Sequence, residues 1–409
     1  MNLSNCRNCF GKKLNFLFSL GELSFTGKFP KTNKENIPRK EISLVKCQKC
    51  HLVQLNKNFN LNYLYNTDYG YRSGINHTMR NHLKKVVENL IKIVEPKNND
   101  YVLDIASNDG TLLNFYNKKL TTIGVDPILK KFSKFYRNIN YRINGFFSKK
   151  VLEKILCNNK KIKIISALSV FYDLKKPNDF LKDISCILDE KVGVFYLEFC
   201  DLGSIIKKNL FDTICHEHLE YYSIEVIIDM AKKNQLRVFD IVQNNINGGS
   251  TGFYICKKNA LYKNNTTNIN KILKTEIKLN LKKLKTYKNL FNNILKIKKK
   301  LTTMLENLTQ KGKIIHGYGA STKGNVLIQF FDLNKNQIRF ISDRNPEKKN
   351  CYTPGSKIKI ISEKLSRRLK PDYYLVLPWH FKKEILLREK KMLKFGTRFI
   401  FPLPKIKII

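Results

Sequence analysis

The stretch YVLDIASNDGTLL, residues 101–113, decides the fold class of this chain. An apolar run ends at Asp104, small and polar residues follow, and apolar residues return at Leu112 and Leu113. This order predicts a buried strand, a tight turn and a helix that begins near Gly110. Such a turn presents backbone N–H groups at a helix N-terminus, where a ligand can bind. The stretch therefore predicts an α/β fold with a ligand site at the edge of its sheet.

The next predicted strand also ends in an acidic residue, Asp126 in TTIGVDP. A carboxylate at this position is typical of proteins that hold a ribose diol. The dinucleotide fingerprint GxGxxG is absent, and Ala106 and Ser107 stand in the preceding turn. Because small residues join strand to helix in any α/β protein, the interpretation as a nucleotide-type site depends on Asp126.

Strand and helix patterns alternate from about residue 75 to 260, and again after about residue 310. The amphipathic segment between them, about 270–309, predicts one long helix. Its heptad pattern is too irregular for a coiled coil, so we expect an interdomain brace. The apolar stripe of this predicted helix consists of Leu281, Leu284, Phe291, Ile294, Leu301, Met304 and Leu308.

The bulk composition is that of a folded multidomain protein. The 409 residues predict two or three domains, and 42% hydrophobic residues suffice for sizeable cores. No apolar run has the roughly 20 residues that a membrane-spanning helix needs. The N-terminal residues lack the apolar region of a signal peptide. We therefore expect a cytoplasmic protein without a membrane partner.

The net charge of +43 comes from 76 Lys and Arg residues against 33 Asp and Glu residues. Such an excess is typical of nucleic-acid-binding proteins. Here the basic residues are mostly lysines that are spread along the chain, in runs such as KNNTTNINKILK, and arginine is scarce. We therefore expect no nucleic-acid partner. General compositional drift and an acidic, phosphate-bearing small substrate both remain open as explanations of the charge.

Two CxxC pairs lie near the N-terminus, Cys6 with Cys9 and Cys47 with Cys50. Each CxxC turn aims two thiolates at one point, and two such turns complete a tetrahedral zinc site. Four thiolates close the coordination shell, so the pattern predicts a structural zinc rather than a catalytic one. Two unrelated pairs of reduced cysteines are the alternative.

The stretch DTICHEHLEYYS, residues 212–223, gathers titratable side chains in a predicted loop before a helix capped by Ser223. A metal site, a proton-transfer site and a polar surface loop are the three interpretations. The metal interpretation is disfavoured because two histidines at i and i+2 share a face only in a strand, and the helical HExxH spacing is absent.

Five motifs together resemble those of the sugar C-methyltransferases: the double CxxC, VLDIASNDGTLL, HEHLEYYS, NNINGGSTGFYI and GYGASTKGN. Enzymes of this family use S-adenosylmethionine to methylate carbon on nucleotide-linked keto-deoxysugars. The resemblance covers nearly the whole chain, in the family's order. It implies a zinc-ribbon-like domain over residues 1–62, a Rossmann-like class I methyltransferase domain over 63–262, and a Rossmann-like substrate-binding domain over 263–409.

The resemblance also implies which residues meet the cofactor. Asp126 would hold its ribose hydroxyls, and Phe146 and Phe147 would lie near its adenine side. Its methionine end would be lined by Asp104, Ala106, Asn108 and Gly110. Two positions depart from the family. Ala106 replaces a common glycine, and where some members have a histidine after the next strand, Tyr172 or Asp173 is nearest.

Carbon methylation requires a base that removes a proton beside a ketone, and donors that stabilise the resulting enolate oxygen. The resemblance matches Glu217 and His218 to the family's catalytic Glu-His pair and Tyr71 to its active-site tyrosine. His218 suits the role of the base, and Glu217 could orient its imidazole or that of a neighbour. Tyr71 or Tyr222 could donate to the enolate oxygen. His216 and Cys215 are assigned to structure.

The nucleotide sugar would lie on two small-residue turns. One is NINGGS, with Asn247, Gly248 and Gly249. The other follows KIIH, where Gly317, Gly319, Ala320, Ser321, Thr322 and Lys323 could cradle a diphosphate. Asp343, Trp379 and His380 would edge the same cleft.

The sequence thus favours an S-adenosylmethionine-dependent C-methyltransferase with a structural zinc and a small nucleotide-linked sugar substrate. An O-methyltransferase acting on a related nucleotide sugar is the alternative among enzymes. A zinc-containing nucleic-acid-binding protein is the alternative from another class. The presence of both Asp104 and Asp126 argues against the latter.

Overall fold

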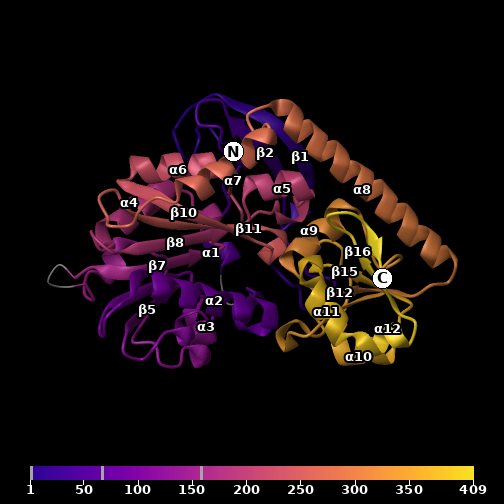
Figure 1. Cartoon of the computed structure of the whole chain (residues 1–409). Coiled ribbons are helices and arrows are strands. Elements are labelled where there is room, and N and C mark those ends of the chain that lie inside the picture. The colour runs from indigo at the N-terminus through magenta and orange to yellow at the C-terminus, as the bar shows by residue number, and fades with distance from the viewer. Residues whose placement is uncertain (1–2, 66–68, 157–159) are drawn as a thin grey trace.

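The computed structural model describes residues 3–65, 69–156 and 160–409. Over these residues the chain forms three sheets with helices around them (Figure 1). The N-terminal sheet has four strands, the central sheet seven and the C-terminal sheet six. The central and C-terminal sheets are mostly parallel and carry helices, which confirms the predicted α/β fold class.

The N-terminal sheet is antiparallel throughout and includes a strand from far along the chain. Its order is β1 (Leu14–Ser24), β2 (Arg39–Cys47), β3 (Val53–Leu55) and β9 (Glu220–Tyr221). Gln54 of β3 pairs with Glu220, and Val53 pairs with Tyr221. The end of the HEHLEYYS stretch, predicted as loop, is therefore a short strand that fixes this loop to the N-terminal sheet.

The central sheet is wound in both directions from β4. Its order is β10 (Leu236–Asn244), β11 (Ser250–Lys257), β8 (Val194–Phe199), β7 (Ile162–Leu168), β4 (Tyr101–Ile105), β5 (Thr121–Asp126) and β6 (Tyr141–Asn144). The five strands from β8 to β6 are parallel, and β11 is antiparallel to both neighbours. The strand order reverses at β4, and such a switch point is where open α/β sheets bind ligands.

Helices cover both faces of the central sheet. On one face α2 (His77–Val94) buries Met79, Leu83, Val86, Val87, Leu90 and Val94. Its core cluster includes Val102 and Val194 from the sheet. On the other face α4 (Pro177–Ile187) and α6 (Ile224–Lys233) pack in a second cluster. The remaining short helices of this part are α1 (Leu61–Leu64), α3 (Leu129–Phe132) and α5 (Leu202–Lys208).

The helix predicted to begin near Gly110 is absent, and that prediction was wrong. Between β4 and β5, all of which the structure describes, the only helical element is the 3₁₀ segment Leu113–Phe115. Asp109 accepts hydrogen bonds from the backbone N–H and hydroxyl of Thr111 at 3.3 and 2.6 Å, and Asn114 donates its amide to the Phe135 carbonyl at 2.9 Å. Asp and Asn side chains that bond to nearby backbone in this way compete with helix formation.

The segment predicted as one long helix is two helices, α7 (Thr266–Lys278) and α8 (Leu284–Gln310). Asn280 between them has φ +52°, a left-handed conformation that ends a helix. Leu284 of the predicted stripe is 47% exposed, whereas Ile294 and Leu301 are fully buried. Phe291 of α8 stacks on Phe18 of β1 at 4.9 Å. The helix thus runs from the N-terminal sheet along the C-terminal part, as Figure 1 shows.

The C-terminal sheet is a second open α/β sheet. Its order is β14 (Ile360–Ser362), β13 (Phe340–Asp343), β12 (Ile315–Tyr318), β15 (Tyr373–Val376), β16 (Arg398–Phe401) and β17 (Lys407–Ile408), parallel except for β17. Its helices are α9 (Thr322–Phe330), α10 (Glu363–Arg368), α11 (Lys382–Arg388) and α12 (Lys390–Lys394). The strand order reverses at β12, so this sheet has its own switch point.

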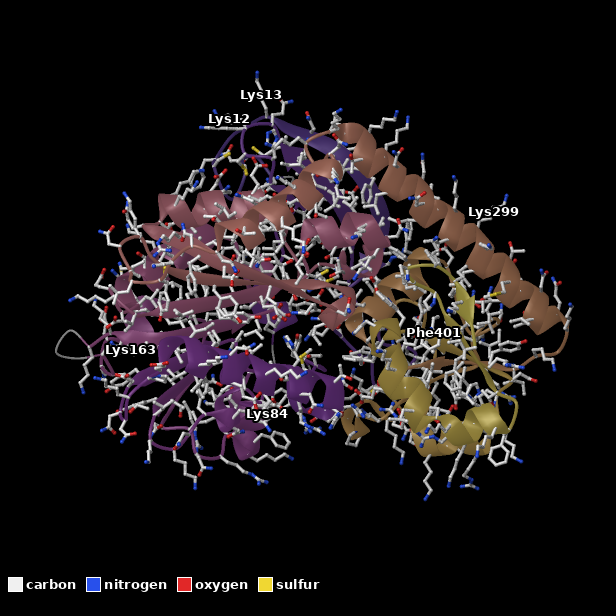
Figure 2. The ribbon with its side chains drawn as sticks, in the orientation of Figure 1. Lys12, Lys13, Lys84, Lys163, Lys299 and Phe401 are labelled. Carbon is white, nitrogen blue, oxygen red and sulfur yellow. The ribbon has the colours of Figure 1, made fainter. Side chains whose placement is uncertain are left out.

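The surface lysines are spread over the molecule. Lys12 and Lys13 lie at the N-terminal sheet, Lys84 on α2 and Lys299 on α8, and their side chains point outward on different sides (Figure 2). This distribution agrees with lysine enrichment along the whole chain. Among the helices of the described residues, none combines the length and the apolar character that crossing a membrane requires.

Candidate active site

A cavity of about 380 Å³ lies between the carboxyl ends of the parallel strands of the central sheet and those of the C-terminal sheet. Residues from distant parts of the chain line it, and many of them were predicted from sequence. The predicted residues at this cavity are Tyr71, Ala106, Asn108, Asp126, Phe146, Phe147, Glu217, His218, Asn247, Gly319, Ala320, Ser321, Thr322, Lys323 and Asp343. Tyr172, Asp173 and His380 line it as well.

The turn after β4 forms the wall predicted to meet the cofactor. Ala106, Asn108 and Gly110 have φ values of +57°, +50° and +70°. For Ala106 this left-handed conformation costs about 1–2 kcal/mol, which glycine would avoid. Asp126 holds the turn, because its carboxylate accepts the backbone N–H groups of Asn108 and Ile128, each at 2.8 Å. Burial raises the pKa of Asp126 to about 6.

Asp104 and Gly110 lie behind this wall rather than at the cavity. Asp104 is 4% exposed and accepts a hydrogen bond from the Ser166 hydroxyl at 2.6 Å. Burial raises its pKa to about 7. A Cβ added to Gly110 would meet Ile139 and Tyr136 at 3.0 and 3.2 Å, so this glycine faces the core. Both residues support the turn from beneath.

The segment 69–76 bridges the cofactor turn and the C-terminal part. The backbone N–H groups of Ser73 and Gly74 donate to Asn108 Oδ1 at 2.9 Å and Asp109 Oδ2 at 3.0 Å. On the other side Arg344 donates to the Ile75 carbonyl at 2.6 Å. The segment places Tyr71, which is 39% exposed, at the cavity.

His218 presents a base to the cavity. Its Nδ1 lies 2.6 Å from the Thr213 carbonyl oxygen, which can only accept. We therefore assign the ring proton to Nδ1, which leaves Nε2 unprotonated. Burial, and secondarily the charge of Lys323, lowers the pKa of His218 to about 3, so the ring is neutral near pH 7. The ring packs on Tyr172 with 4.0 Å between the two ring centroids.

Glu217 is not the hydrogen-bond partner of the His218 ring among the described residues. Its carboxylate accepts the Thr26 hydroxyl at 3.3 Å and lies against Gly27, where a Cβ would be 2.8 Å from Oε1. Burial raises the pKa of Glu217. The Thr213 carbonyl, rather than Glu217, holds the orientation of the His218 ring.

Tyr222, His216 and Cys215 lie in the core. The Tyr222 hydroxyl is buried without a hydrogen-bond partner in the described chain, and its ring packs on Phe171 at 4.9 Å. His216 is fully buried, and its Nε2 lies 3.1 Å from the Lys40 carbonyl. Tyr222 is therefore buried behind the cavity and is not one of the residues that line it.

The turn after β12 forms the opposite wall. Lys323 donates to the Asn247 carbonyl at 2.9 Å, which joins this turn to NINGGS. Ser321 caps α9 by accepting the Gly324 N–H at 3.0 Å. Asp343 accepts the Ala320 N–H at 2.7 Å. Lys323 thus belongs to the predicted diphosphate turn and is also close enough to His218 to affect the pKa of its ring.

The other glycines of the predicted substrate turns serve packing. A Cβ on Gly248 would lie 2.6 Å from Trp379, and one on Gly317 would lie 2.2 Å from Ile341. Gly249, with φ +149°, lies against Lys208 and Ser204. Trp379 donates its indole N–H to the buried Asp212 at 2.8 Å.

Sequence reasoning missed a histidine–carboxylate pair at the cavity. Nε2 of His82 lies 2.7 Å from Glu198 Oε1, and Tyr196 donates to Glu198 Oε2 at 2.5 Å. An acidic residue near the end of the apolar strand VGVFYLEFC could have drawn attention to Glu198. Nothing in the helical pattern around His82 indicated its partner.

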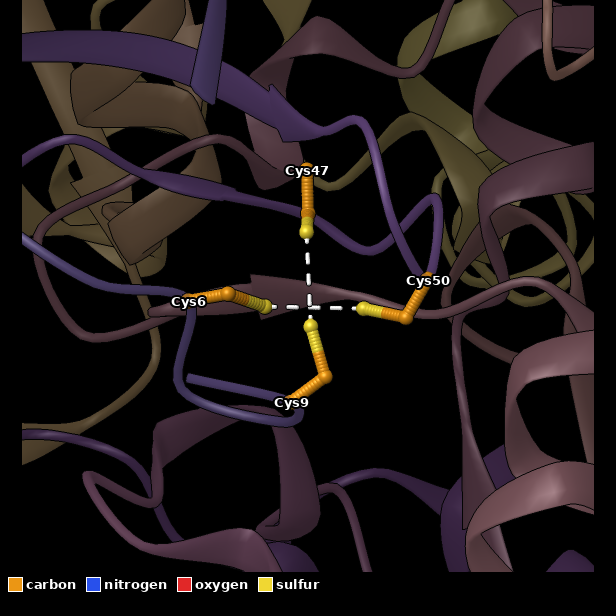
Figure 3. A group of neighbouring side chains, drawn as sticks. All are labelled: Cys6, Cys9, Cys47 and Cys50. Atoms are coloured by element: carbon orange, nitrogen blue, oxygen red, sulfur yellow. Dashed lines mark hydrogen bonds between the residues drawn. The ribbon is translucent and has the colours of Figure 1, made fainter. Parts of the chain in front are cut away.

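The four cysteines of the two CxxC pairs converge. Cys6 Sγ lies 3.5 Å from Cys50 Sγ and Cys9 Sγ lies 3.5 Å from Cys47 Sγ, along the two crossing lines of Figure 3. All four sulfurs are within 4.8 Å of one another. Tetrahedral zinc with Zn–S bonds of about 2.3 Å requires sulfurs about 3.8 Å apart, so the set fits zinc.

The ionisation of these thiols also favours a cation among them. The hydrogen bond from Cys50 lowers the pKa of Cys6 to about 5, while the pKa of Cys50 itself is raised. Four adjacent thiols therefore cannot all ionise unless a cation neutralises them. Phe10 and His51, which follow the two pairs, have φ values of +56° and +60° and close the two turns.

Comparisons with known proteins agree with this architecture. A family described as a methyltransferase domain matches residues 75–241, and one described as a C-methyltransferase C-terminal domain matches residues 245–404. The C-methyltransferase NovU of Streptomyces niveus is 27% identical over 369 residues, which cover 90% of this chain and 87% of NovU.

Two solved structures were matched over part of this chain. An S-adenosylmethionine-dependent methyltransferase of Clostridium acetobutylicum is 15% identical, with a TM-score of 0.35 over 44% of this chain and 92% of that one. Magnesium protoporphyrin IX methyltransferase of Synechocystis, solved with bound S-adenosylhomocysteine, is 12% identical, with a TM-score of 0.34 over 46% of this chain and 90% of that one.

Proposed function

We propose that this chain is an S-adenosylmethionine-dependent C-methyltransferase, which the two matched domain families and the similarity to NovU support, and that it methylates carbon on a nucleotide-linked keto-deoxysugar. The observation that carries the proposal is the state of His218. Its Nδ1 is bonded to the Thr213 carbonyl at 2.6 Å, so the unprotonated Nε2 is free to take a proton from an acceptor in the cavity. A base held in one tautomer by a fixed partner is the arrangement that proton abstraction requires.

The cofactor fits the wall made by the turn after β4. When bound, S-adenosylmethionine supplies an electrophilic methyl group. We propose that Ala106 and Asn108 meet its methionine end, that Asp126 accepts from its ribose hydroxyls, and that Phe147 lies beside its adenine. Asp126 is 4% exposed and already accepts the backbone N–H of Asn108. The same carboxylate would therefore hold the turn in shape and bind the ribose.

The nucleotide end of the acceptor fits the opposite wall. We propose that the backbone of Gly319–Lys323 and the side chain of Lys323 hold the diphosphate, because this turn opens α9 and carries a cation. Arg344 and Lys348 lie at the same cavity and add positive charge. The keto-sugar would then lie between Lys323 and the β4 turn, next to His218.

We further propose that Cys6, Cys9, Cys47 and Cys50 hold a structural zinc. Cys47 ends β2, and the chain from His51 leads directly to β3, which pairs with β9 inside the HEHLEYYS stretch. A metal at this point would therefore hold the strand to which the His218 loop is attached.

Hydrogen exchange at the acceptor tests the role of His218. With S-adenosylhomocysteine in place of the methyl donor, the enzyme should exchange the hydrogen beside the ketone for deuterium from heavy water. Removal of a general base costs about 10²–10⁴-fold, so His218→Ala should lose exchange by that factor. His77→Ala, which changes an exposed histidine on α2, is the matched control. A His218→Ala rate within about threefold of wild type would reject the assignment.

A further inference from the structure

Asp173 is a buried carboxyl group at the cavity, close to the position where some members of the resembled family have a histidine. It ends the 3₁₀ segment Phe171–Asp173, directly after β7, and is 6% exposed. Its Oδ2 accepts the Tyr65 hydroxyl at 2.6 Å. Its Oδ1 is buried without a hydrogen-bond partner in the described part of the chain. A buried carboxyl oxygen that lacks a partner requires an explanation.

The surroundings of Asp173 favour the protonated acid. Burial, and then the nearby Glu217, raises its pKa well above the ordinary range, although the Tyr65 hydrogen bond acts in the opposite direction. The titratable groups close enough to interact electrostatically with Asp173 are Tyr65, Tyr69, Tyr172, Cys215, Glu217, Glu220, Tyr221 and Tyr222. Arg7 pairs with Glu220 at 3.5 Å rather than with Asp173. These surroundings favour the protonated carboxyl group of Asp173 over the carboxylate.

Asp173 and His218 belong to connected segments of one wall. Tyr172, the neighbour of Asp173, packs on the His218 ring at 4.0 Å. The carbonyl of Tyr172 also accepts the Leu219 N–H at 2.6 Å, which joins the 3₁₀ segment to the HEHLEYYS loop. Asp173 and His218 both line the cavity, so an acid and a base face the same space.

We propose that Asp173, held by Tyr65, is the proton donor to the carbonyl oxygen of the acceptor. This assignment rests on the proposed carbon methylation. Nε2 of His218 takes the proton beside the ketone, the electron pair of that C–H bond forms the C=C bond, and the carbonyl oxygen receives the proton of Asp173. When the enol carbon then takes the methyl group of S-adenosylmethionine, S-adenosylhomocysteine would be the leaving group, the carbonyl re-forms, the O–H proton returns to Asp173, and His218 releases its proton to solvent.

The chemistry needs such a donor because the base is weak. The pKa of His218 is lowered to about 3 by burial and by Lys323, so the imidazole can abstract a proton from carbon only if the developing oxyanion is neutralised. A carboxylic acid kept neutral by an apolar site, with a tyrosine beside it, is a known means of stabilising an enolate. Asp173 has the same kind of neighbour in Tyr65, which here donates its hydroxyl to Asp173 itself.

The test is the pH dependence of deuterium exchange at the acceptor, measured with S-adenosylhomocysteine. Wild-type exchange should fall as pH rises through the raised pKa of Asp173, since only the acid donates. Asp173→Asn keeps a donor that does not titrate, so its exchange should be slower but free of this fall. Tyr65→Phe removes the bond that lowers the pKa, so the fall should move to higher pH. Asp173→Ala should lose about 10²–10³-fold, as for other oxyanion donors.

Calorimetric binding of S-adenosylhomocysteine shows that each variant is folded. The inference would be overturned if deuterium exchange by Asp173→Asn had the same pH dependence as that by wild type. It would also be overturned if the exchange rate of Asp173→Ala were within about threefold of the wild-type rate. If exchange requires His218 but does not change when Asp173 is substituted, the role of Asp173 is rejected and the proposed function is not. Exchange that survives His218→Ala would reject the proposed function instead.

Discussion

Glu384 of the C-terminal part caps a helix of the central part, and removing this cap should loosen one wall of the cavity. Asn76 precedes α2 but makes no capping hydrogen bond, and its side-chain oxygen is taken by Arg344. Instead, Glu384 accepts both the N–H and the hydroxyl of Thr78, at 3.0 and 2.7 Å. The side chain of Glu384 is 16% exposed, so water does not replace these bonds freely.

The magnitude follows from the two bonds that are lost. Loss of an N-terminal cap costs about 0.5–2 kcal/mol, and loss of a carboxylate beside a helix N-terminus costs about 0.3–1 kcal/mol. Because Glu384 is mostly buried, we expect Glu384→Ala to cost about 1–2 kcal/mol locally. That free energy corresponds to about 5–30-fold faster hydrogen exchange of the first amides of α2.

Amide hydrogen exchange read by mass spectrometry measures this effect on peptides that span residues 69–80. Glu384→Gln retains an oxygen that can accept from Thr78, so its exchange should lie between those of wild type and Glu384→Ala. Glu347→Gln, which changes a 54% exposed partner of Lys131, is the surface control and should match wild type. Unchanged exchange in Glu384→Ala would refute the assignment of Glu384 as the cap.

Three further results are expected. Cys9→Ser should remove the near-stoichiometric zinc that elemental analysis of wild-type protein should find, and unchanged metal content would reject the four-cysteine site. Asp126→Ala should weaken calorimetric binding of S-adenosylmethionine by about 1–3 kcal/mol, and binding of NAD instead of S-adenosylmethionine would contradict the assignment of the cofactor. Because burial raises the pKa of Asp173, wild-type stability should fall as pH rises toward that pKa. The melting temperature of Asp173→Asn should therefore rise relative to that of wild type as pH rises. A difference between the two melting temperatures that does not change with pH would reject the raised pKa of Asp173.

The sequence was informative about the sheets because buried parallel strands are continuous apolar runs. The runs before Asp104 and Asp126 became β4 and β5, side by side. The helix ends were less predictable. A left-handed Asn280 divides the helix predicted for 270–309, and a turn at Asp109 stops the helix expected after β4. The first outcome depends on the backbone conformation of Asn280, and the second on the hydrogen bonds of the Asp109 side chain. Hydrophobic periodicity predicts neither.

The candidate site was predictable where its residues follow strands, and not where tertiary packing decides. Asn108 and Asp126 lie at strand ends, so their place at the cavity follows from the fold class. The pair of His82 and Glu198 joins a helix to a strand 116 positions along the chain, and only the packed structure brings the two together. For Asp173, the residue type permitted either a base or an acid, and burial distinguishes between them.

The central claim is that this enzyme attaches a methyl group to carbon. S-adenosylmethionine carrying a ¹³C-labelled methyl group, incubated with the enzyme and a nucleotide-linked keto-deoxysugar, tests it by NMR of the product. We predict a labelled methyl carbon bonded directly to a ring carbon beside the ketone, formed by wild type and not by His218→Ala. A labelled methyl carbon bonded to oxygen would contradict the claim and would identify an O-methyltransferase.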